Sequence, residues 1–272
     1  MENLGALVRE RRSVRTYDGA GLKAENLDKL SAFMTDLENP YGVAVTCKLL
    51  SGKEQKLSCV VANGTDLFVG AKAKKTDHME EAFGYSFERL VLYAQSLGVG
   101  TVWVGGTMDR PAFEAAMELE ADERMPCMSP LGYPAKKQSI KESLMRKGVG
   151  ADKRKDFGEL FYEGDFETPL TPDKAGELAK PLELVRWAPS AVNKQPWRVV
   201  VTAGAVHFYL KHSKGFVSDA VGDMQKIDMG IALCHFDLVM KEQGRSPAFS
   251  LADPGIQTPE DTEYIASYRL DA

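Results

Sequence analysis

The sequence lacks a long apolar run, both near its first residue and elsewhere. No run approaches the roughly 20 consecutive apolar residues that a membrane-spanning helix needs. The opening segment "MENLGALVRERRSVR" also has no apolar core of the kind found in secretory signals. We therefore expect a cytoplasmic protein with no membrane partner.

Basic charge, cysteine and histidine are also scarce. The chain has 34 Lys and Arg residues against 39 Asp and Glu residues, a formal net charge of −5. This balance argues against a general nucleic-acid-binding role, which usually needs a basic face. The four histidines do not cluster, and no CxxC pair is formed by the four cysteines Cys47, Cys59, Cys127 and Cys234. We expect neither a disulfide framework nor a metal site.

The chain does contain enough apolar sequence for one large domain or two small ones. It has 272 residues, of which 44% are hydrophobic. The periodicity of apolar residues predicts an α+β fold. We expect helices over 2–12, 23–37, 77–98, 109–119, 170–188 with a kink at Pro181, and 223–244. We expect strands over 42–50, 66–73, 100–106 and 264–272, and a strand that leaves into a loop over 125–137. We also expect a hairpin over 196–210 that turns at Ala203-Gly204.

The second half of the sequence repeats features of the first half in the same order. Segment 22–33 is similar to 170–181, "PYGVAVT" is similar to "PWRVVVT", and long predicted helices end at Gly98 and Gly244. The offsets between these pairs are 148, 156 and 146 residues, so the repeat contains insertions. The alternative is two unrelated α+β segments that share a common pattern.

A cluster of arginines follows the first predicted helix, in "RERRSVRTYDG". Arg9, Arg11, Arg12 and Arg15 surround Ser13. The planar guanidinium fork can donate two parallel hydrogen bonds to a phosphate. The alternative is a solvated basic helix end. The following "VRTYDG" favours the ligand site, because the chain there turns away from the helix.

Two further segments could present hydrogen-bonding groups to a ligand. The loop "APSAVNKQPW" is stiffened by prolines at both ends, and its polar side chains are Ser190, Asn193 and Gln195. The alternative for this loop is a helix cap followed by a strand entry. The segment "LGVGTVWVGG" does not match the G-x-G-x-x-G dinucleotide fingerprint. Its Gly-Gly end would still let backbone N–H groups come close to a ligand.

Taken together, these motifs resemble the FMN-dependent nitroreductase superfamily over nearly the whole chain. The resemblance rests on "RRSVR", "LGVGTVWVGG", "LGYPAKK" followed by "DKRKDFGELF", and "APSAVNKQPW". It implies a nitroreductase-like α+β fold and an FMN cofactor, with NADH or NADPH as the hydride donor. The implied reaction is ping-pong transfer to a small-molecule acceptor such as a nitroaromatic or a quinone.

The resemblance also implies roles for particular residues. Arg11, Arg12, Ser13 and Arg15 would hold the phosphate, the ribityl chain and the N1–O2 edge of the flavin. Trp103, Val104, Gly105 and Gly106 would lie beside the ring, with the Gly105 N–H at N5 and Gly106 at O4. Lys153 and Arg154 would complete the phosphate site, with other candidates between Arg146 and Lys155. Pro189, Ser190 and Asn193 would flank the ring, and no side chain would act as a catalytic acid or base.

The order of the motifs departs from that of the family. There the "APS" loop follows "RRSVR" by one helix and reaches the flavin of the neighbouring subunit. Here that place is occupied by "DLEN", and the loop lies in the second half, which has no counterpart of "RRSVR" or "WVGG". We therefore expect a fused pair of nitroreductase-like halves, 1–160 and 161–272, with two pseudo-symmetric parts and one FMN site. Such a chain can be monomeric, because its dimer-like interface is internal.

Two other interpretations remain. A half-degenerate duplication can lose catalysis, which would leave an FMN-binding protein without turnover, such as a flavin carrier or sensor. Alternatively, the chain could keep the scaffold alone and bind no flavin.

Overall fold

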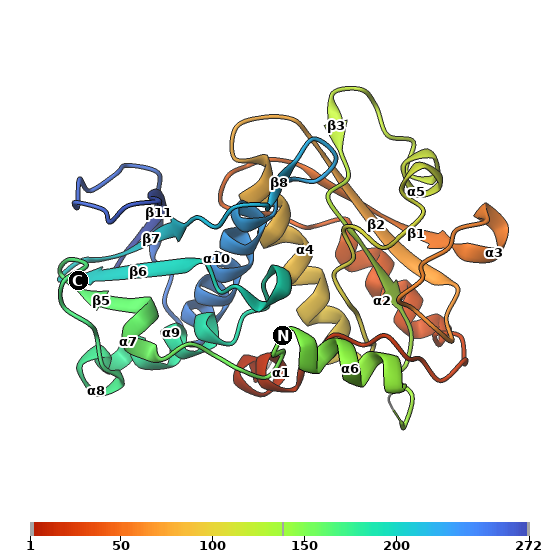
Figure 1. The fold of residues 1–272 in the computed structure, drawn as a ribbon, viewed down its shortest axis with the longest axis horizontal. Coiled ribbons are helices and arrows are strands. Elements are labelled where there is room, and N and C mark those ends of the chain that lie inside the picture. Colours follow the sequence, from red (N-terminus) through yellow and green to blue (C-terminus); the bar gives the residue numbers. More distant parts are fainter. Residues whose placement is uncertain (1–2, 138, 271–272) are drawn as a thin grey trace.

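The computed structural model describes residues 3–137 and 139–270 and shows a mixed α+β arrangement (Figure 1). Two long helices cross at the centre, with one sheet on each side. The elements of the first half are α1 (Leu4–Glu10), α2 (Ala24–Met34), β1 (Val45–Ser51), α3 (Gly52–Gln55), β2 (Leu67–Lys74), α4 (Met79–Ser96), α5 (Arg110–Ala116), β3 (Glu123–Arg124), β4 (Met128–Leu131), α6 (Ile140–Gly148) and α7 (Phe157–Leu160). Those of the second half are β5 (Phe161–Glu163), α8 (Pro172–Ala175), η1 (Gly176–Leu178), α9 (Ala179–Arg186), η2 (Ala191–Asn193), β6 (Trp197–Thr202), β7 (Ala205–Lys211), β8 (Val217–Ser218), β9 (Gly222–Asp223), α10 (Met224–Glu242), β10 (Ala248–Ser250) and β11 (Thr262–Arg269).

Each half contributes its own sheet. In the first sheet β2 pairs with β1 along its length and also with β3 and β4, all antiparallel. The second sheet has the order β10-β11-β7-β6-β5, and β5 runs parallel to β6 while the other pairs are antiparallel. The predicted hairpin is confirmed, because β6 and β7 pair from Trp197–Leu210 to Thr202–Ala205.

The helices α4 and α10 cross at two glycines that make reciprocal contacts. A Cβ atom on Gly84 would lie 2.0 Å from the Ile227 carbonyl oxygen, and one on Gly230 would lie 2.0 Å from the Glu81 carbonyl oxygen. Only glycine allows backbones to approach this closely. Both pairs of equivalent residues are 146 positions apart, the same offset that separates Gly98 from Gly244. A two-fold axis that relates α4 to α10 would produce such a pair of equivalent contacts.

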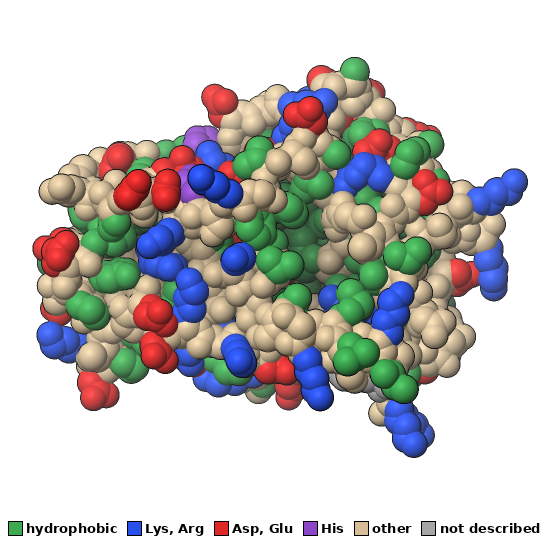
Figure 2. All heavy atoms as spheres, viewed as in Figure 1, with side chains coloured by type: hydrophobic (Ala, Val, Ile, Leu, Met, Phe, Trp, Pro, Cys, Tyr) green, Lys and Arg blue, Asp and Glu red, His purple; other side chains and the backbone are tan. Residues whose placement is uncertain are grey.

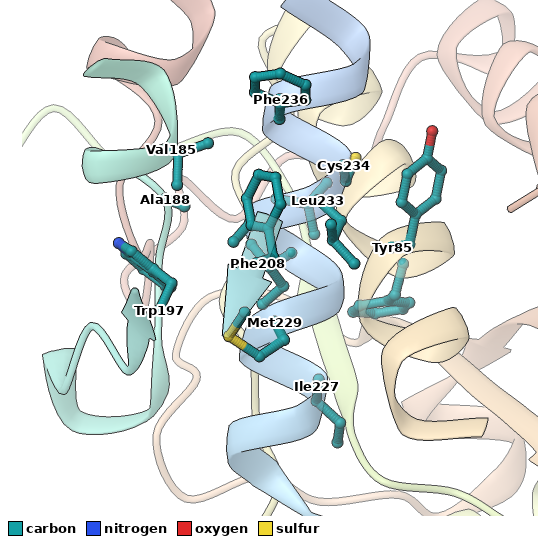
Figure 3. Packing of buried hydrophobic residues seen from close by; sticks show 14 of the residues in the cluster. Tyr85, Val185, Ala188, Trp197, Phe208, Ile227, Met229, Leu233, Cys234 and Phe236 are labelled. Carbon is teal, nitrogen blue, oxygen red and sulfur yellow. The ribbon is translucent and has the colours of Figure 1, made fainter. Parts of the chain in front are cut away.

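The core is shared by the two halves. One cluster of buried apolar side chains includes Phe83 and Phe87 from α4 together with Trp197, Phe208 and Phe236 from the second half. In Figure 3, α10 lies between α4 on one side and the segments that carry Val185 and Trp197 on the other. Burial of this surface stabilises the fold. It also ties the segments 1–160 and 161–272 together.

Most predicted helices and strands are observed with shifted ends, and one predicted helix is wrong. The first helix covers Leu4–Glu10, and residue 2 lies outside the described ranges. The predicted continuous helix over 170–188 is instead three pieces, α8, η1 and α9. The break falls at Gly176, whose φ is +54°, and not at Pro181. That proline lies in the first turn of α9, where its missing N–H costs little.

Two predicted strands also differ from the structure. Segment 100–106 forms isolated bridges, such as Val104 with Met128, in place of a continuous strand. The last strand spans Thr262–Arg269, and the end of the predicted strand, residues 271 and 272, lies outside the described part. Among the described residues, no helix is both long and apolar enough to cross a membrane.

Candidate functional site

A cavity of about 520 Å³ is lined by residues from both halves of the chain. Its walls come from the segment after α1, the turn at Trp103–Gly105, α6 with the segment that follows it, the loop 189–193, and the first turns of α10. Figure 2 shows a hollow with hydrophobic side chains near the middle of the drawn face. The volume lies in the range of small-molecule and cofactor sites.

The segment after α1 is held in an extended conformation that directs its side chains into the cavity. Ser13 forms a parallel bridge with Thr101, and the Val14 N–H donates to the Thr101 carbonyl at 2.8 Å. Val14 is buried, whereas Ser13 and Arg15 line the cavity. Successive side chains of an extended segment point to opposite faces. The alternation therefore places Ser13 and Arg15 on the cavity side.

Arginines with unsatisfied donors gather at one end of the cavity. Within the described ranges, neither Arg11 nor Arg15 has a side-chain hydrogen bond or ion pair, and the Nε atoms of Arg11, Arg15 and Arg154 are buried without a partner. Burial lowers the pKa of Arg11 and of Arg15, against the attraction of Glu88 and Glu142 respectively, and repulsion from Arg146 adds to the shift. Burial and the positive charge of Arg11 lower the pKa of Arg154 to about 10. This cluster is suited to an anion.

Other basic residues at the same end already have carboxylate partners. Arg12 donates to Glu142 at 3.1 Å, and Arg146 pairs with Asp152. Glu142 is buried and also accepts a hydrogen bond from the Thr16 hydroxyl at 2.8 Å. These two guanidinium groups still line the cavity, but part of their hydrogen-bonding capacity is used within the protein.

The loop after α9 is fixed by several hydrogen bonds. The Asp228 carboxyl accepts from the Ala191 N–H at 3.0 Å. Asn193 Nδ2 donates to the carbonyls of Gly150 at 2.7 Å and Lys153 at 3.0 Å. The Gln195 N–H donates to Ser190 Oγ at 2.9 Å. Asn193 therefore braces the loop against the segment after α6, and both its amide hydrogens are used within the protein.

The same loop holds three residues in the left-handed region. The φ angles are +44° at Val192, +58° at Asn193 and +50° at Gln195. A β-branched residue at positive φ is uncommon and strained. The Val192 side chain is 58% exposed at the rim of the cavity. Its hydrogen-bonded neighbours hold the loop in this conformation, which presents an apolar group at the cavity entrance.

A buried hydrogen-bond chain fixes Trp103 on the cavity wall. The Trp103 Nε1–H donates to Glu88 at 3.1 Å, and the other Glu88 oxygen lies 2.9 Å from His235 Nε2. His235 Nδ1 lies 2.9 Å from the Leu184 carbonyl and must donate to it, because a carbonyl only accepts. Glu88 and His235 are completely buried. The chain thus links α4, α10 and α9 to the indole ring.

The structure brings most of the predicted site residues to one place. The predicted residues that line the cavity are Arg11, Arg12, Ser13, Arg15, Trp103, Gly105, Arg154, Pro189, Ser190 and Asn193. Val104 is buried behind the wall in its bridge with Met128, and Gly106 and Lys153 are exposed outside it. Gly105 accepts a hydrogen bond from Arg110, and its N–H has no partner among the described residues.

Sequence reasoning missed the contribution of α10. Met224, Ile227, Asp228 and Ile231 line the cavity from its first two turns. The signal was an acidic residue within the otherwise apolar segment "IDMGIALC". Arg146, which the sequence left among several candidates, also lines the cavity. No cluster of potential metal ligands occurs in the described part of the chain.

Comparisons with known proteins agree with this architecture. A family model described as "Putative TM nitroreductase" matches residues 3–240. The structure of a "putative nitroreductase" from Thermotoga maritima is 22% identical, covers 98% of this chain and 94% of its own, and has a TM-score of 0.61. An FMN-dependent nitroreductase from Clostridium difficile is 18% identical over 52% of this chain and 94% of its own, with a TM-score of 0.42. A comparison with the curated proteins gives no match.

Proposed function

Since the chain belongs to the nitroreductase family, we propose that it is an FMN-dependent NAD(P)H oxidoreductase. NADH or NADPH is the hydride donor, and a nitroaromatic, quinone or similar small molecule is the acceptor. When bound, FMN supplies the redox chemistry by accepting and delivering hydride at N5. The protein binds and orients the reactants and adjusts their electrostatic surroundings.

The observation that carries this proposal is the set of three unpartnered guanidinium Nε atoms at one cavity. A buried donor without a partner costs about 1–3 kcal/mol, and more for a charged group. A phosphate accepts charge-assisted hydrogen bonds from such forks. Arg11, Arg15 and Arg154 supply these Nε donors at the same cavity. The Nη atoms of Arg154 already donate to the carbonyls of Ala151, Lys153 and Trp187. An anionic cofactor of the size of FMN would satisfy groups that the protein leaves unsatisfied.

The remaining residues fit an aromatic ring next to this anion site. Trp103 is fixed by Glu88, and Gly105 offers a free N–H at the same wall. Pro189 and Ser190 face them from the second half of the chain. Between Arg146 and Lys155, we assign Arg154 and Arg146 to the phosphate in preference to Lys153. Lys153 is exposed outside the cavity.

The cavity described above would serve the two substrates in succession. Val149 and Val192, which are 40% and 58% exposed, form apolar parts of its rim. A flat donor and a flat acceptor would therefore use the same entrance in turn, as ping-pong kinetics require. Because residues from both halves build the cavity, we propose one FMN per chain and a monomer as the functional unit.

The test is spectroscopic. Purified protein should be yellow, or become so after incubation with FMN, and anaerobic NADH or NADPH should bleach the flavin absorbance. A bound flavin that neither nucleotide can reduce would favour a carrier or sensor. A protein that stays colourless with FMN would contradict the proposal and favour the flavin-free scaffold.

A further inference from the structure

Asp228 is a carboxylic acid buried in the wall of the cavity. Asp228 is 3% exposed and lies in the second turn of α10. Its two carboxyl oxygens lie 3.0 and 3.1 Å from the Ala191 nitrogen, and no other hydrogen-bond partner occurs in the described ranges. Its neighbours on the same helix face are the apolar residues Met224, Ile227 and Ile231. This environment does not compensate a carboxylate charge.

The surroundings favour the neutral form of this carboxyl. Burial raises the pKa of Asp228 well above its usual range, the Ala191 N–H acts in the opposite direction, and the negative charge of Asp223 raises it further. The other charged groups that line the cavity are Arg9, Glu10, Arg11, Arg12 and Arg15 from the segment at α1, Arg146 from α6, and Asp152 and Arg154 from the segment behind it. A neutral acid can accept from Ala191 with one oxygen and donate from the other. That donor has no protein acceptor among the described residues.

We propose that Asp228 donates the proton that completes reduction of the acceptor, an inference that rests on the proposed function. Reduction of a quinone to the hydroquinone takes two electrons and two protons. The hydride supplies both electrons and one proton. Asp228 supplies the second proton: its O–H bond breaks, an O–H bond forms on the acceptor oxygen, and the carboxylate regains a proton from solvent. For a nitro group the same proton helps one oxygen to leave as water.

This assignment is specific to one half of the molecule. The residue 146 positions before Asp228 on α4 is Ala82, which is also buried. At this pair of equivalent positions an acid therefore occurs only on α10, where it faces the cavity.

The decisive variant is Asp228→Asn, because the amide oxygen can still accept from the Ala191 N–H while the acidic proton is lost. We expect turnover with a benzoquinone to fall on the order of 100-fold, as for loss of a general acid. Turnover with ferricyanide, which takes electrons without protons, should change less than about threefold, since it needs no general acid. Asp237→Asn is the matched control, because Asp237 is also buried on α10 but pairs with Tyr85 and Lys241 away from the cavity. Its quinone-to-ferricyanide ratio should equal that of the wild type.

A second measurement needs neither cofactor nor turnover. The infrared spectrum of the flavin-free protein at neutral pH should contain the carbonyl stretch of a protonated carboxylic acid that shifts in D₂O. That band should be missing in Asp228→Asn and retained in Asp237→Asn. An unchanged spectrum in Asp228→Asn would overturn the inference.

The outcomes separate this inference from the proposed function. If the wild type reduces both acceptors and Asp228→Asn keeps its quinone turnover, the proton-donor role is wrong and the oxidoreductase function stands. If the wild type binds FMN but reduces neither acceptor, the proposed function fails, and the donor role fails with it. Equal losses with quinone and ferricyanide would mean that Asp228 only positions the loop 189–195, which also contradicts the inference.

Discussion

The two central helices have the same crossing but present different surfaces at their N-terminal ends. On α10, Met224, Ile227 and Ile231 line an open cavity. At the start of α4, the residues at the 146-position offset are the N-cap His78, Glu81 and Tyr85, none of which lines the cavity. The Tyr85 hydroxyl donates to Asp237 on α10. His78 stacks on Tyr41 with ring centroids 5.3 Å apart.

Tyr41 itself comes from the loop that replaces the "APS" loop in the first half, and it also packs edge-on against Phe249 at 4.9 Å. At the start of α4 the protein thus fills the space with the aromatic side chains of Tyr41, His78 and Phe249. At the start of α10 the corresponding space is the open cavity, which is lined by arginines.

The loops of the two halves differ in the same way. In the first loop Gly42 takes the positive φ of +68°, which glycine tolerates without strain. In the second loop the positive φ angles belong to Val192, Asn193 and Gln195. Strained backbone of this kind persists only where its surroundings fix it, and it clusters at functional sites. The strained loop is the one that lines the cavity.

The largest effect should come from the helix crossing that both halves share. Gly84→Ala and Gly230→Ala each place a methyl group 2.0 Å from a backbone carbonyl oxygen. Because backbone cannot move as a side chain can, each should lower the free energy of unfolding by about 3 kcal/mol or more, at or above the upper end for overpacking. Gly148→Ala is the control, since nothing lies within 4 Å of a Cβ there. Denaturant titration measures all three, and a harmless Gly84→Ala would disprove the close crossing.

The next effect distinguishes arginines inside the cavity from basic residues outside it. Arg15→Ala should weaken FMN binding by about 1.5–3 kcal/mol, or roughly 10- to 150-fold in Kd, because a charge-assisted hydrogen bond is lost. Lys153→Ala should change the affinity by less than about 0.5 kcal/mol, because this residue is exposed. Equal effects of the two variants in a fluorescence titration would remove Arg15 from the site.

Asp228 should make the free energy of unfolding depend on pH, and Asp228→Asn should remove that dependence. Below about pH 3.9 the folded and the unfolded wild type both hold the proton, so the variant and the wild type should differ little. Above that pH the unfolded state ionises while burial keeps the folded carboxyl protonated. Wild-type stability should then fall relative to the variant by about 1.4 kcal/mol per pH unit until the folded pKa is reached. Parallel stability profiles from pH 3 to 7 would contradict a raised pKa.

The smallest effect concerns the strained loop. Val192→Gly should raise the free energy of unfolding by up to about 1 kcal/mol, because glycine adopts positive φ without strain. The matched change Val217→Gly removes another exposed valine, one that has no positive φ and lies in β8. It should be neutral or destabilising. A loss of stability in Val192→Gly as large as that in Val217→Gly would show that the loop is not strained.

Local patterns predicted much of this structure. Patterns among residues close together in the sequence predicted the amphipathic helices, the hairpin at Ala203-Gly204 and the two motif segments. The α+β class follows from these elements. The break at Gly176 was missed because a proline at 181 is an equally strong signal until tertiary packing shows which turn it occupies. The role of Asp228 depends on a contact with Ala191, 37 residues away, which no local pattern encodes.

The site was predicted in the same uneven way. Arg11 and Arg15 could be identified because an arginine cluster is unusual in an acidic chain. The difference between Arg154 and Lys153 could not be seen, since adjacent basic residues look alike until the fold buries one and exposes the other.

The central claim is that two related halves build a single flavin site, and equilibrium titration tests it most directly. Flavin-free protein of known concentration is titrated with FMN, and the quenching of flavin fluorescence gives the number of tight sites per chain. The account predicts one site, because among the described residues only one of the two related positions has arginines with unpartnered Nε atoms at an open cavity. Two tight sites per chain would contradict it, since the position around Tyr41 would then also have to bind FMN.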